Sequence, residues 1–216
     1  MGFLSKLFGK TEAETTKQEI KYTKAKTNNI TEGDNIPPLQ GAYAKTIFLW
    51  ANEKASPVKK SSEYARYFLY ECGIRDCVSY HLDLISDGYF EEASTKLVLD
   101  SLKTADLKQI LTDIGQPVTG KKDALISRIL ATQDEISISK YCPQKLYVLT
   151  EKGSAFLNVH NDYVQIHKHK NWGIDWKEYD AHKIPGRSYY DTMWAIFNEQ
   201  LANNPHDCGR GQYLYM

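Results

Sequence analysis

The residues best suited to chemistry are four consecutive residues between two segments with apolar side chains at helical spacing: Thr119, Gly120, Lys121 and Lys122. The second of these segments is expected to begin as a helix near Lys121. A helix N-terminus leaves backbone N–H groups without partners and carries partial positive charge, so it attracts anions. Two lysines beside it add full charges. The pattern therefore predicts a binding site for a phosphate group.

Two amphipathic helices are expected to position this turn. Apolar residues of the first share one face, namely Leu102, Leu107, Ile110, Leu111 and Ile114. Thr104 or Ser101 is expected to cap its start, because short hydroxyl side chains accept from free helical N–H groups. Gly115 suits the position after the helix end, and Pro117 prevents continuation.

The second helix is expected to be amphipathic as well. Its predicted inward residues are Leu125, Ile126, Ile129 and Leu130. Lys122 and Arg128 are left outside, where Lys103 and Lys108 of the first helix could extend the positive charge. A plain helical hairpin with solvated lysines is the alternative interpretation.

Residues 97–131 resemble the SAP motif, a helix–extended turn–helix module that binds DNA. The resemblance rests on three stretches in the expected order: Leu102-x-x-x-Asp106-Leu107-Lys108, Gly115-x-Pro117-x-Thr119-Gly120-Lys121-Lys122, and Leu125-Ile126-x-Arg128-Ile129. Gln116 departs from the family, which usually has an apolar residue there. The resemblance implies DNA binding independent of base sequence, through phosphate contacts of Thr119, Gly120, Lys121, Lys122, Lys103, Lys108 and Arg128.

A second resemblance surrounds the first. Residues 61–71 and 77–87 are expected to be helices, with Tyr64, Phe68 and Leu69 inward in one and Val78, Leu82 and Ile85 inward in the other. Gly88-Tyr89-Phe90 and Tyr147-Val148-Leu149-Thr150 then resemble the wing of winged-helix DNA-binding proteins, Thr150 capping a helix from Glu151. The resemblance implies a SAP-like hairpin inserted in the wing. Its recognition surface would offer Arg75, Ser79, Tyr80, His81 and Asp83, which is poor in cations; a helical domain that uses the turn for packing is the alternative.

The C-terminal third is expected to be helical. Residues 156–170 carry Val159, Tyr163 and Ile166 at helical spacing, Asp175 is placed to start a short helix, and Ser188 or Asp191 the last one. The last helix is expected to bury Met193, Trp194, Ile196, Phe197 and Leu201. Lys168 and Lys170 lie beside Trp172 and Trp176, a pattern typical of a surface that contacts phosphate or stacks a base.

Metal and catalytic motifs give little support to an enzyme. The histidine-rich group consists of His160, Asp162, His167, His169 and His182, but it has no known zinc-site spacing, so we predict no metal. The motifs of nucleotide-binding loops and hydrolase elbows are missing. We therefore predict a non-catalytic protein without a cofactor.

Composition restricts how such a protein would bind nucleic acid. The chain of 216 residues has 27 basic and 27 acidic residues, so positive charge must be concentrated locally. Residues 102–131 hold five lysine or arginine residues against three aspartates. So small an excess predicts weak, salt-sensitive binding.

The N-terminal residues 1–40 are polar and are expected to form a disordered arm. Phe3, Leu4, Leu7 and Phe8 could share one face of a short helix, so residues 1–10 could anchor to a membrane or a partner, although a frayed end is the simpler expectation. No membrane-spanning or secretory segment is recognised, and the four scattered cysteines are expected to be free thiols in a reducing compartment. These features favour a cytoplasmic protein, and the Lys, Asn, Ile and Tyr usage fits an AT-rich bacterium or phage.

Together these patterns predict a mainly α (α+β) fold. The expected parts are a disordered arm (1–40), the helix-turn-helix part of a winged-helix-like domain (41–96), a SAP-like hairpin (97–135), and a wing strand with a helical C-terminal region (136–216). The leading function is non-catalytic DNA binding. The alternative is a protein-interaction scaffold or adaptor, in which these modules serve packing and partner docking.

Overall fold

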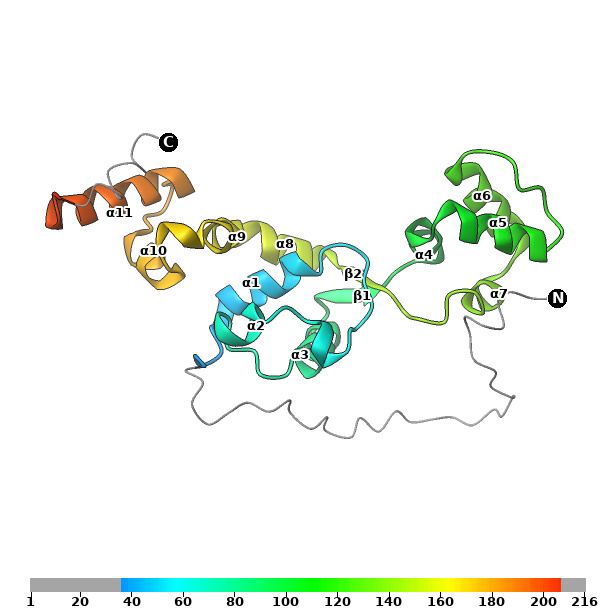
Figure 1. Cartoon of the computed structure of the whole chain (residues 1–216), viewed down its shortest axis with the longest axis horizontal. Helices are drawn as coiled ribbons and strands as arrows, with labels where there is room; N and C mark the ends of the chain where they lie inside the picture. The colour runs from blue at the N-terminus through cyan, green and yellow to red at the C-terminus, as the bar shows by residue number, and fades with distance from the viewer. Residues whose placement is uncertain (1–35, 207–216) are drawn as a thin grey trace. The chain divides into compact units, whose positions relative to one another are not determined.

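The computed structural model describes residues 36–206, and the predicted mainly helical fold with a helical hairpin is confirmed (Figure 1). The elements in chain order are α1 (Gly41–Ala51), η2 (Ser61–Glu63), α2 (Tyr67–Tyr70), α3 (Cys77–Ser86), β1 (Phe90–Glu92), α4 (Thr95–Ser101), α5 (Thr104–Asp113), α6 (Lys122–Thr132), α7 (Glu135–Ser139), β2 (Tyr147–Leu149), α8 (Glu151–Val159), α9 (Asn161–Lys168), η3 (Lys170–Trp172), α10 (Trp176–His182) and α11 (Tyr189–Asn203). The predictions for residues 1–10 and for most of the N-terminal arm lie outside the described residues.

The two strands pair with each other across a long interval of the chain. They are antiparallel, with Phe90 opposite Leu149 and Glu92 opposite Tyr147. Helices α4 to α7 lie between them in sequence, so this helical insert leaves and re-enters the rest of the protein at adjacent points. The strand positions agree with the wing expected from the sequence. The winged-helix relationship itself stays a prediction.

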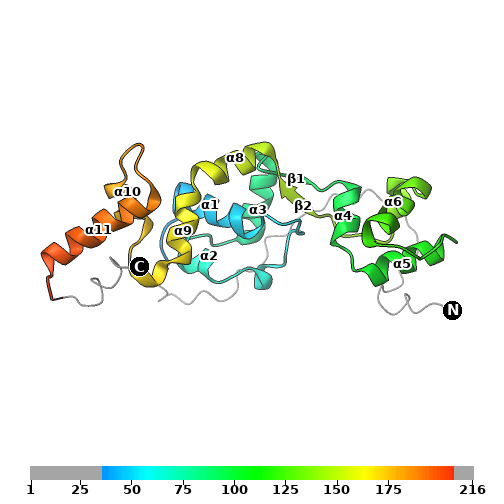
Figure 2. The ribbon, with the colours of Figure 1, turned by 90° about the horizontal axis from the view of Figure 1, so that it is seen from above.

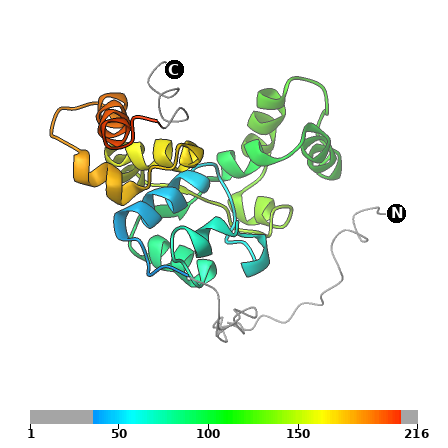
Figure 3. The same ribbon diagram turned by 60° about the vertical axis from the view of Figure 1, so that its left-hand side comes forward.

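One apolar core, here called the main core, gathers residues from α1 to β1 and from α9 to α11. Helix α1 lies at its centre because its residues are apolar almost all round; Ile47, Phe48 and Leu49 are fully buried. Figures 2 and 3 show α1 next to α8 and α9, the two helices against which it packs. The main core is rich in aromatic rings, with Phe48 in contact with those of Phe68 and Tyr64.

A second apolar core, here called the hairpin core, is formed within the insert. Its buried residues come from α4 to α7 and are Leu99, Leu107, Ile110, Leu111, Leu125, Ile126, Ile129 and Ile138. The apolar faces predicted for the two hairpin helices are thus confirmed, with two exceptions. Leu102 packs partly buried against this core but lies between α4 and α5, outside the helix to which it was assigned. Leu130, expected to point inward, is 38 % exposed, because it lies beyond the α6 face that Leu125 and Ile129 turn toward α5.

Helix α8 is fixed tightly against the turn between α3 and β1. Thr150 caps α8 as predicted: its Oγ1 accepts from the N–H of Gly153 at 3.0 Å and donates to the carbonyl of Gly88 at 2.7 Å. A Cβ atom at position 153 would lie 2.3 Å from the carbonyl oxygen of Tyr89. Only glycine therefore permits this approach of α8 to the turn.

The expected helix over residues 61–71 is wrong. The chain forms only the short η2 and α2, because Tyr64 between them is extended (φ −79°, ψ 144°). Tyr64 and Phe68 are nevertheless buried as predicted. In the following helix α3, Val78, Leu82 and Ile85 are only partly buried; the fully buried positions are His81 and Leu84.

The expected continuous helix over residues 156–170 is also wrong. Helix α8 ends at Val159, and α9 starts on its own axis after His160, whose backbone (φ −106°, ψ 19°) is not helical. Tyr163 and Ile166 consequently face the core, whereas Val159 is 72 % exposed. The predicted starts at Asp175 and Ser188 are confirmed by side-chain caps. Trp194 of α11, expected to be buried, is 60 % exposed.

Within the described part of the chain, no helix is both long and apolar enough to cross a membrane. Helix α11 is the longest of the helices described, and it carries charged residues among its apolar ones. This finding concerns residues 36–206 alone.

Candidate nucleic-acid interface

Helix α5 ends in a glycine turn. This turn directs the chain into residues 116–121, here called the extended segment, which lead to α6. Gly115 has a φ of +69°, which glycine adopts at no steric cost. The N–H of Gln116 donates to Leu111 at 2.8 Å, and that of Gly115 donates to Thr112 at 3.1 Å. This is the hydrogen-bond pattern of a Schellman motif, so the predicted role of Gly115 is confirmed.

Arg128 of α6 is hydrogen-bonded to the extended segment. Its Nη1 donates to the carbonyl oxygens of Pro117 and Thr119, the latter at 3.2 Å. Arg128 lies outside the hairpin core as predicted, but the path of the turn also brings two carbonyls to it, which the sequence pattern did not indicate. Its charge remains, but its geometry is that of a residue that positions the turn.

Lys122 fixes where α6 begins. Its Nζ donates to the carbonyl oxygen of Asp100, near the end of α4. Helices α4 and α6 also pack against each other, and Figure 1 shows the extended segment running back so that α6 begins near α4. The start of α6 therefore lies beside the junction of α4 and α5, where Lys103 is located. Lys122, expected to be left outside, is half-buried at this contact.

The caps at these two helix starts differ from the prediction. Neither Thr104 nor Ser101 caps α5: Thr104 is its first helical residue, and the Ser101 hydroxyl donates to Val98. Lys103 is the cap residue, and its N–H donates to the Asp106 carboxylate at 3.1 Å. At α6 the cap residue is Lys121, and no side chain in the described residues caps that helix. Its first N–H groups thus have no side-chain acceptor.

The charges around the two starts are available to a ligand. Thr119, Gly120, Lys121 and Lys103 are exposed. Among residues 36–206, none of the five cations of this hairpin forms an ion pair within 4.0 Å. Lys108 is exposed one turn further along α5. The structure therefore brings Lys103 to the same end of the hairpin as Lys121 and Lys122, while Arg128 braces the turn.

The second predicted contact surface, on α3, is not formed as expected. Arg75 is exposed, and the Ser79 hydroxyl donates to Asp76 at 2.7 Å. His81 is 0 % exposed, and its Nδ1 lies 2.9 Å from the Tyr64 hydroxyl. Burial, with a smaller effect of Lys59, lowers the pKa of His81 to about 4. This histidine belongs to the main core, because α3 turns His81 and Leu84 inward together.

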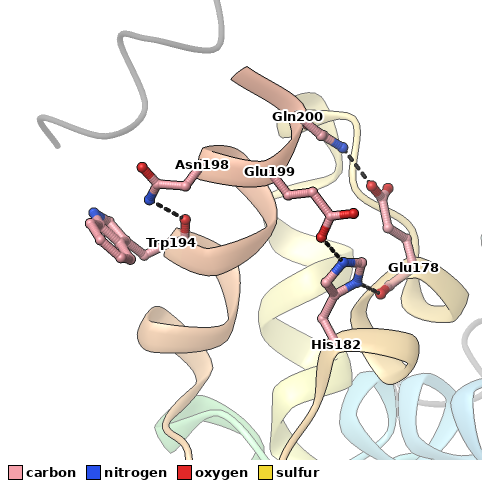
Figure 4. A network of polar contacts seen from close by, with 6 residues as sticks. All are labelled: Glu178, His182, Trp194, Asn198, Glu199 and Gln200. Atoms are coloured by element: carbon pink, nitrogen blue, oxygen red, sulfur yellow. Dashed lines mark hydrogen bonds and ion pairs between the residues drawn. The ribbon is translucent and has the colours of Figure 1, made fainter. Parts of the chain in front are cut away.

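The histidine-rich group does not assemble into one site. His167 pairs with Glu71 at 2.7 Å, and His169 lies 3.2 Å from the Tyr189 hydroxyl. Figure 4 shows His182 between the Glu178 carbonyl, at 2.7 Å, and the Glu199 carboxylate, at 2.8 Å. In the part of the chain that the structure describes, no group of three His, Cys, Asp or Glu side chains could hold a metal ion.

The lysines at the end of α9 remain at the surface but are engaged. Lys168 is exposed, with its Nζ 5.3 Å from the centre of the Trp50 ring. Lys170 is exposed and lies 3.8 Å from Glu71. The neighbouring Trp172 is partly buried, with its ring stacked on that of His169 at 4.2 Å. The two lysines thus stay exposed, while one face of the Trp172 ring is covered by His169, and the Trp176 ring is stacked on that of Tyr43.

Comparison with known proteins gives one match. Residues 98–132 match the model of the SAP domain, and this stretch runs from within α4 to the end of α6. No curated protein and no solved structure matches the chain. The matched residues include the glycine turn, the extended segment and both helix starts described above. Residues 98–132 are therefore identified as a SAP domain, and this match suggests contact with nucleic acid in general.

Proposed function

We propose that this protein binds DNA without catalysing a reaction, through the end of the SAP domain where α5 and α6 begin. The observation that carries the proposal is the contact of Lys122 with Asp100, which sets the uncapped start of α6 beside Lys103. Backbone N–H groups and ammonium groups on one side of a rigid turn suit a phosphate. We assign direct contacts to Thr119, Gly120, Lys121, Lys122, Lys103 and Lys108, and a bracing role to Arg128.

This site would bind weakly and without base readout. Its few cations would neutralise about three phosphates, which corresponds to a slope of roughly −3 in a plot of log affinity against log salt. The residues assigned to the site lie on a turn and at two helix starts, and none of them belongs to a recognition helix that would contact base edges. The affinity should consequently depend on salt more than on DNA sequence.

The proposal is tested by charge reversal at Lys103 and Lys121, two exposed side chains that form no ion pair with any residue between 36 and 206. We expect Lys103→Glu/Lys121→Glu to weaken DNA binding at least tenfold, or about 1.4 kcal/mol, because two phosphate contacts become repulsive. Fluorescence anisotropy would be measured with a labelled duplex and a single strand of equal length, at low and physiological salt. Lys122 and Arg128 are left unchanged because their side chains hold carbonyl groups of the fold.

The matched control is Lys54→Glu/Lys60→Glu, which makes the same charge change at exposed lysines outside the SAP domain. If only the net charge of the protein mattered, DNA binding would be weakened equally in both double variants. If the SAP variant binds as tightly as the parent protein, the assigned interface is wrong.

A scaffold function is favoured by a different observation on α11. Tyr190 and Trp194 lie one helical turn apart and are 68 % and 60 % exposed. Large exposed aromatic side chains are enriched where proteins meet. If the protein is a scaffold, the variant Tyr190→Ser/Trp194→Ser should lose its cross-link to a partner protein. The variant Lys103→Glu/Lys121→Glu should still form that cross-link. The opposite result in a cross-linking experiment would exclude the alternative.

A further inference from the structure

Outside the SAP domain, two lysines from distant parts of the sequence meet at one tyrosine ring. The Nζ atom of Lys45 lies 4.4 Å from the centre of the Tyr89 ring, and that of Lys152 lies 4.3 Å from it. Lys45 comes from α1 and Lys152 from α8, two helices that pack side by side (Figure 2). Cation–π attraction holds each ammonium group near the ring.

Further contacts make this cluster rigid. Lys45 Nζ also donates to the Tyr89 hydroxyl at 3.2 Å, and Lys152 Nζ donates to the carbonyl of Asp87 at 2.6 Å. The Tyr89 backbone is fixed because its carbonyl accepts from Thr150 at 3.1 Å. The rings of Tyr89 and Phe156 form a T-shaped contact, with ring centres 5.6 Å apart. The two charges are thus held in place before any ligand arrives.

The arrangement brings two positive charges close together, and the contacts that hold them are made to uncharged groups, namely the Tyr89 ring and hydroxyl and the Asp87 carbonyl. The two ammonium groups lie no more than about 9 Å apart, close enough to repel each other. Within residues 36–206, neither forms an ion pair with a carboxylate. Lys152 also lies in the first turn of α8, the helix end that disfavours a cation. Lys45 is the only charged residue of α1. An anion between the two would relieve both effects.

We propose that Lys45, Tyr89 and Lys152 form a second contact for the phosphate backbone of nucleic acid, separate from the SAP domain. This inference rests on the proposed function, since nucleic acid is the polyanion that a SAP domain would deliver. The Tyr89 ring serves as a holder for the two charges and not as a stacking platform, because ammonium groups and Phe156 occupy its surroundings. The contact should therefore strengthen binding without favouring particular bases.

The test uses the full-length protein and a labelled DNA duplex in a fluorescence anisotropy titration over a range of salt concentrations. For Lys45→Gln/Lys152→Gln we expect affinity to fall about tenfold and the salt slope to become shallower by roughly 1.8, since each lost phosphate contact removes about 0.9. Lys45→Arg/Lys152→Arg, which keeps both charges, should restore most of the binding. Thermal unfolding followed by circular dichroism would show that each variant is folded.

Matched variants separate this inference from the proposed function. Lys54→Gln/Lys60→Gln removes the same charge elsewhere and should bind DNA like the parent protein. If Lys45→Gln/Lys152→Gln leaves both the DNA affinity and its salt slope unchanged, the second contact is wrong, while the SAP interface is unaffected. If Lys103→Glu/Lys121→Glu binds normally but Lys45→Gln/Lys152→Gln does not, the SAP interface falls and the second contact stands. The assignment to nucleic acid would be wrong if the parent protein did not bind DNA but bound phosphatidylserine vesicles, and if Lys45→Gln/Lys152→Gln lost that vesicle binding.

Discussion

Replacement of Leu125 by alanine is expected to unfold the SAP domain while the main core stays folded. Leu125 is 0 % exposed and contributes to the hairpin core alone. The truncation leaves a cavity and should lower the free energy of unfolding by about 2–5 kcal/mol. A core as small as this one supplies roughly 3–5 kcal/mol in total, so the loss approaches its whole stability. DNA binding through the SAP domain should be lost with it.

The position of the tryptophans allows the two cores to be followed separately. All four tryptophans (Trp50, Trp172, Trp176 and Trp194) lie outside the insert, so their fluorescence reports on the rest of the protein. Far-ultraviolet circular dichroism reports on all helices. In urea, Leu125→Ala should shift part of the dichroism transition to lower concentration and leave the fluorescence transition in place.

The control for this substitution lies on the same helix. Leu130 is 38 % exposed, and its replacement by alanine should cost less than about 1 kcal/mol, because little apolar surface is lost and no cavity forms. Equal shifts for Leu125→Ala and Leu130→Ala would contradict the described packing. A shift of both signals by Leu125→Ala would mean that the two cores unfold as one unit.

Acid should destabilise the main core through His81. Its pKa is lowered to about 4 by burial, with a further effect of Lys59, and returns to about 6.5 on unfolding. Between these pH values the unfolded chain binds the proton and the folded chain does not, so stability is complete above pH 6.5 and falls as the pH decreases. The loss amounts to about 3 kcal/mol when pH 4 is reached.

The measurement is the free energy of unfolding from urea denaturation, followed by tryptophan fluorescence at intervals from pH 7.5 to 4. His81→Leu removes the titrating group at similar volume and should flatten the pH dependence, whatever its stability at neutral pH. Glu71 and Asp76 are present in both proteins. Hydrogen bonds outweigh burial and lower their pKa values, so their contributions are lost only as the pH falls through and below the ordinary values of 4.5 and 3.8, equally in parent and variant. Parallel pH profiles for parent and variant would show that His81 is not the group responsible.

The SAP domain could be predicted from the sequence because its determinants are local. The helical spacing of Leu107, Ile110 and Leu111 and the stop at Gly115 all lie within one short stretch. Each feature acts on its immediate neighbours, so a local pattern suffices. The paired strands were also anticipated, from the step at Gly88 and the cap at Thr150. The limits of the individual domains and the direct DNA contacts remain predictions.

Features that depend on the tertiary path could not be predicted. Both faces of α3 carry apolar residues, so the pattern could not tell that His81, a polar residue, would be buried in place of Val78. The carbonyl partners of Lys122 and Arg128 become neighbours only when the extended segment folds back. The meeting of Lys45 with Lys152 has the same cause, since they lie far apart in sequence. Trp194 shows the converse: an apolar residue at helical spacing stays exposed.

The pairing of β1 with β2 across residues 93–146 has a consequence for the order of folding. Closing so long a loop from a random chain costs entropy that is recovered only when the strands meet. The hairpin core joins Leu99 near the start of the insert to Ile138 near its end, so a folded insert already holds the strand-bearing segments close together. A SAP domain that folds early would then shorten the loop that must close before β1 pairs with β2. Chains in which the SAP domain folds late would pair these strands more slowly.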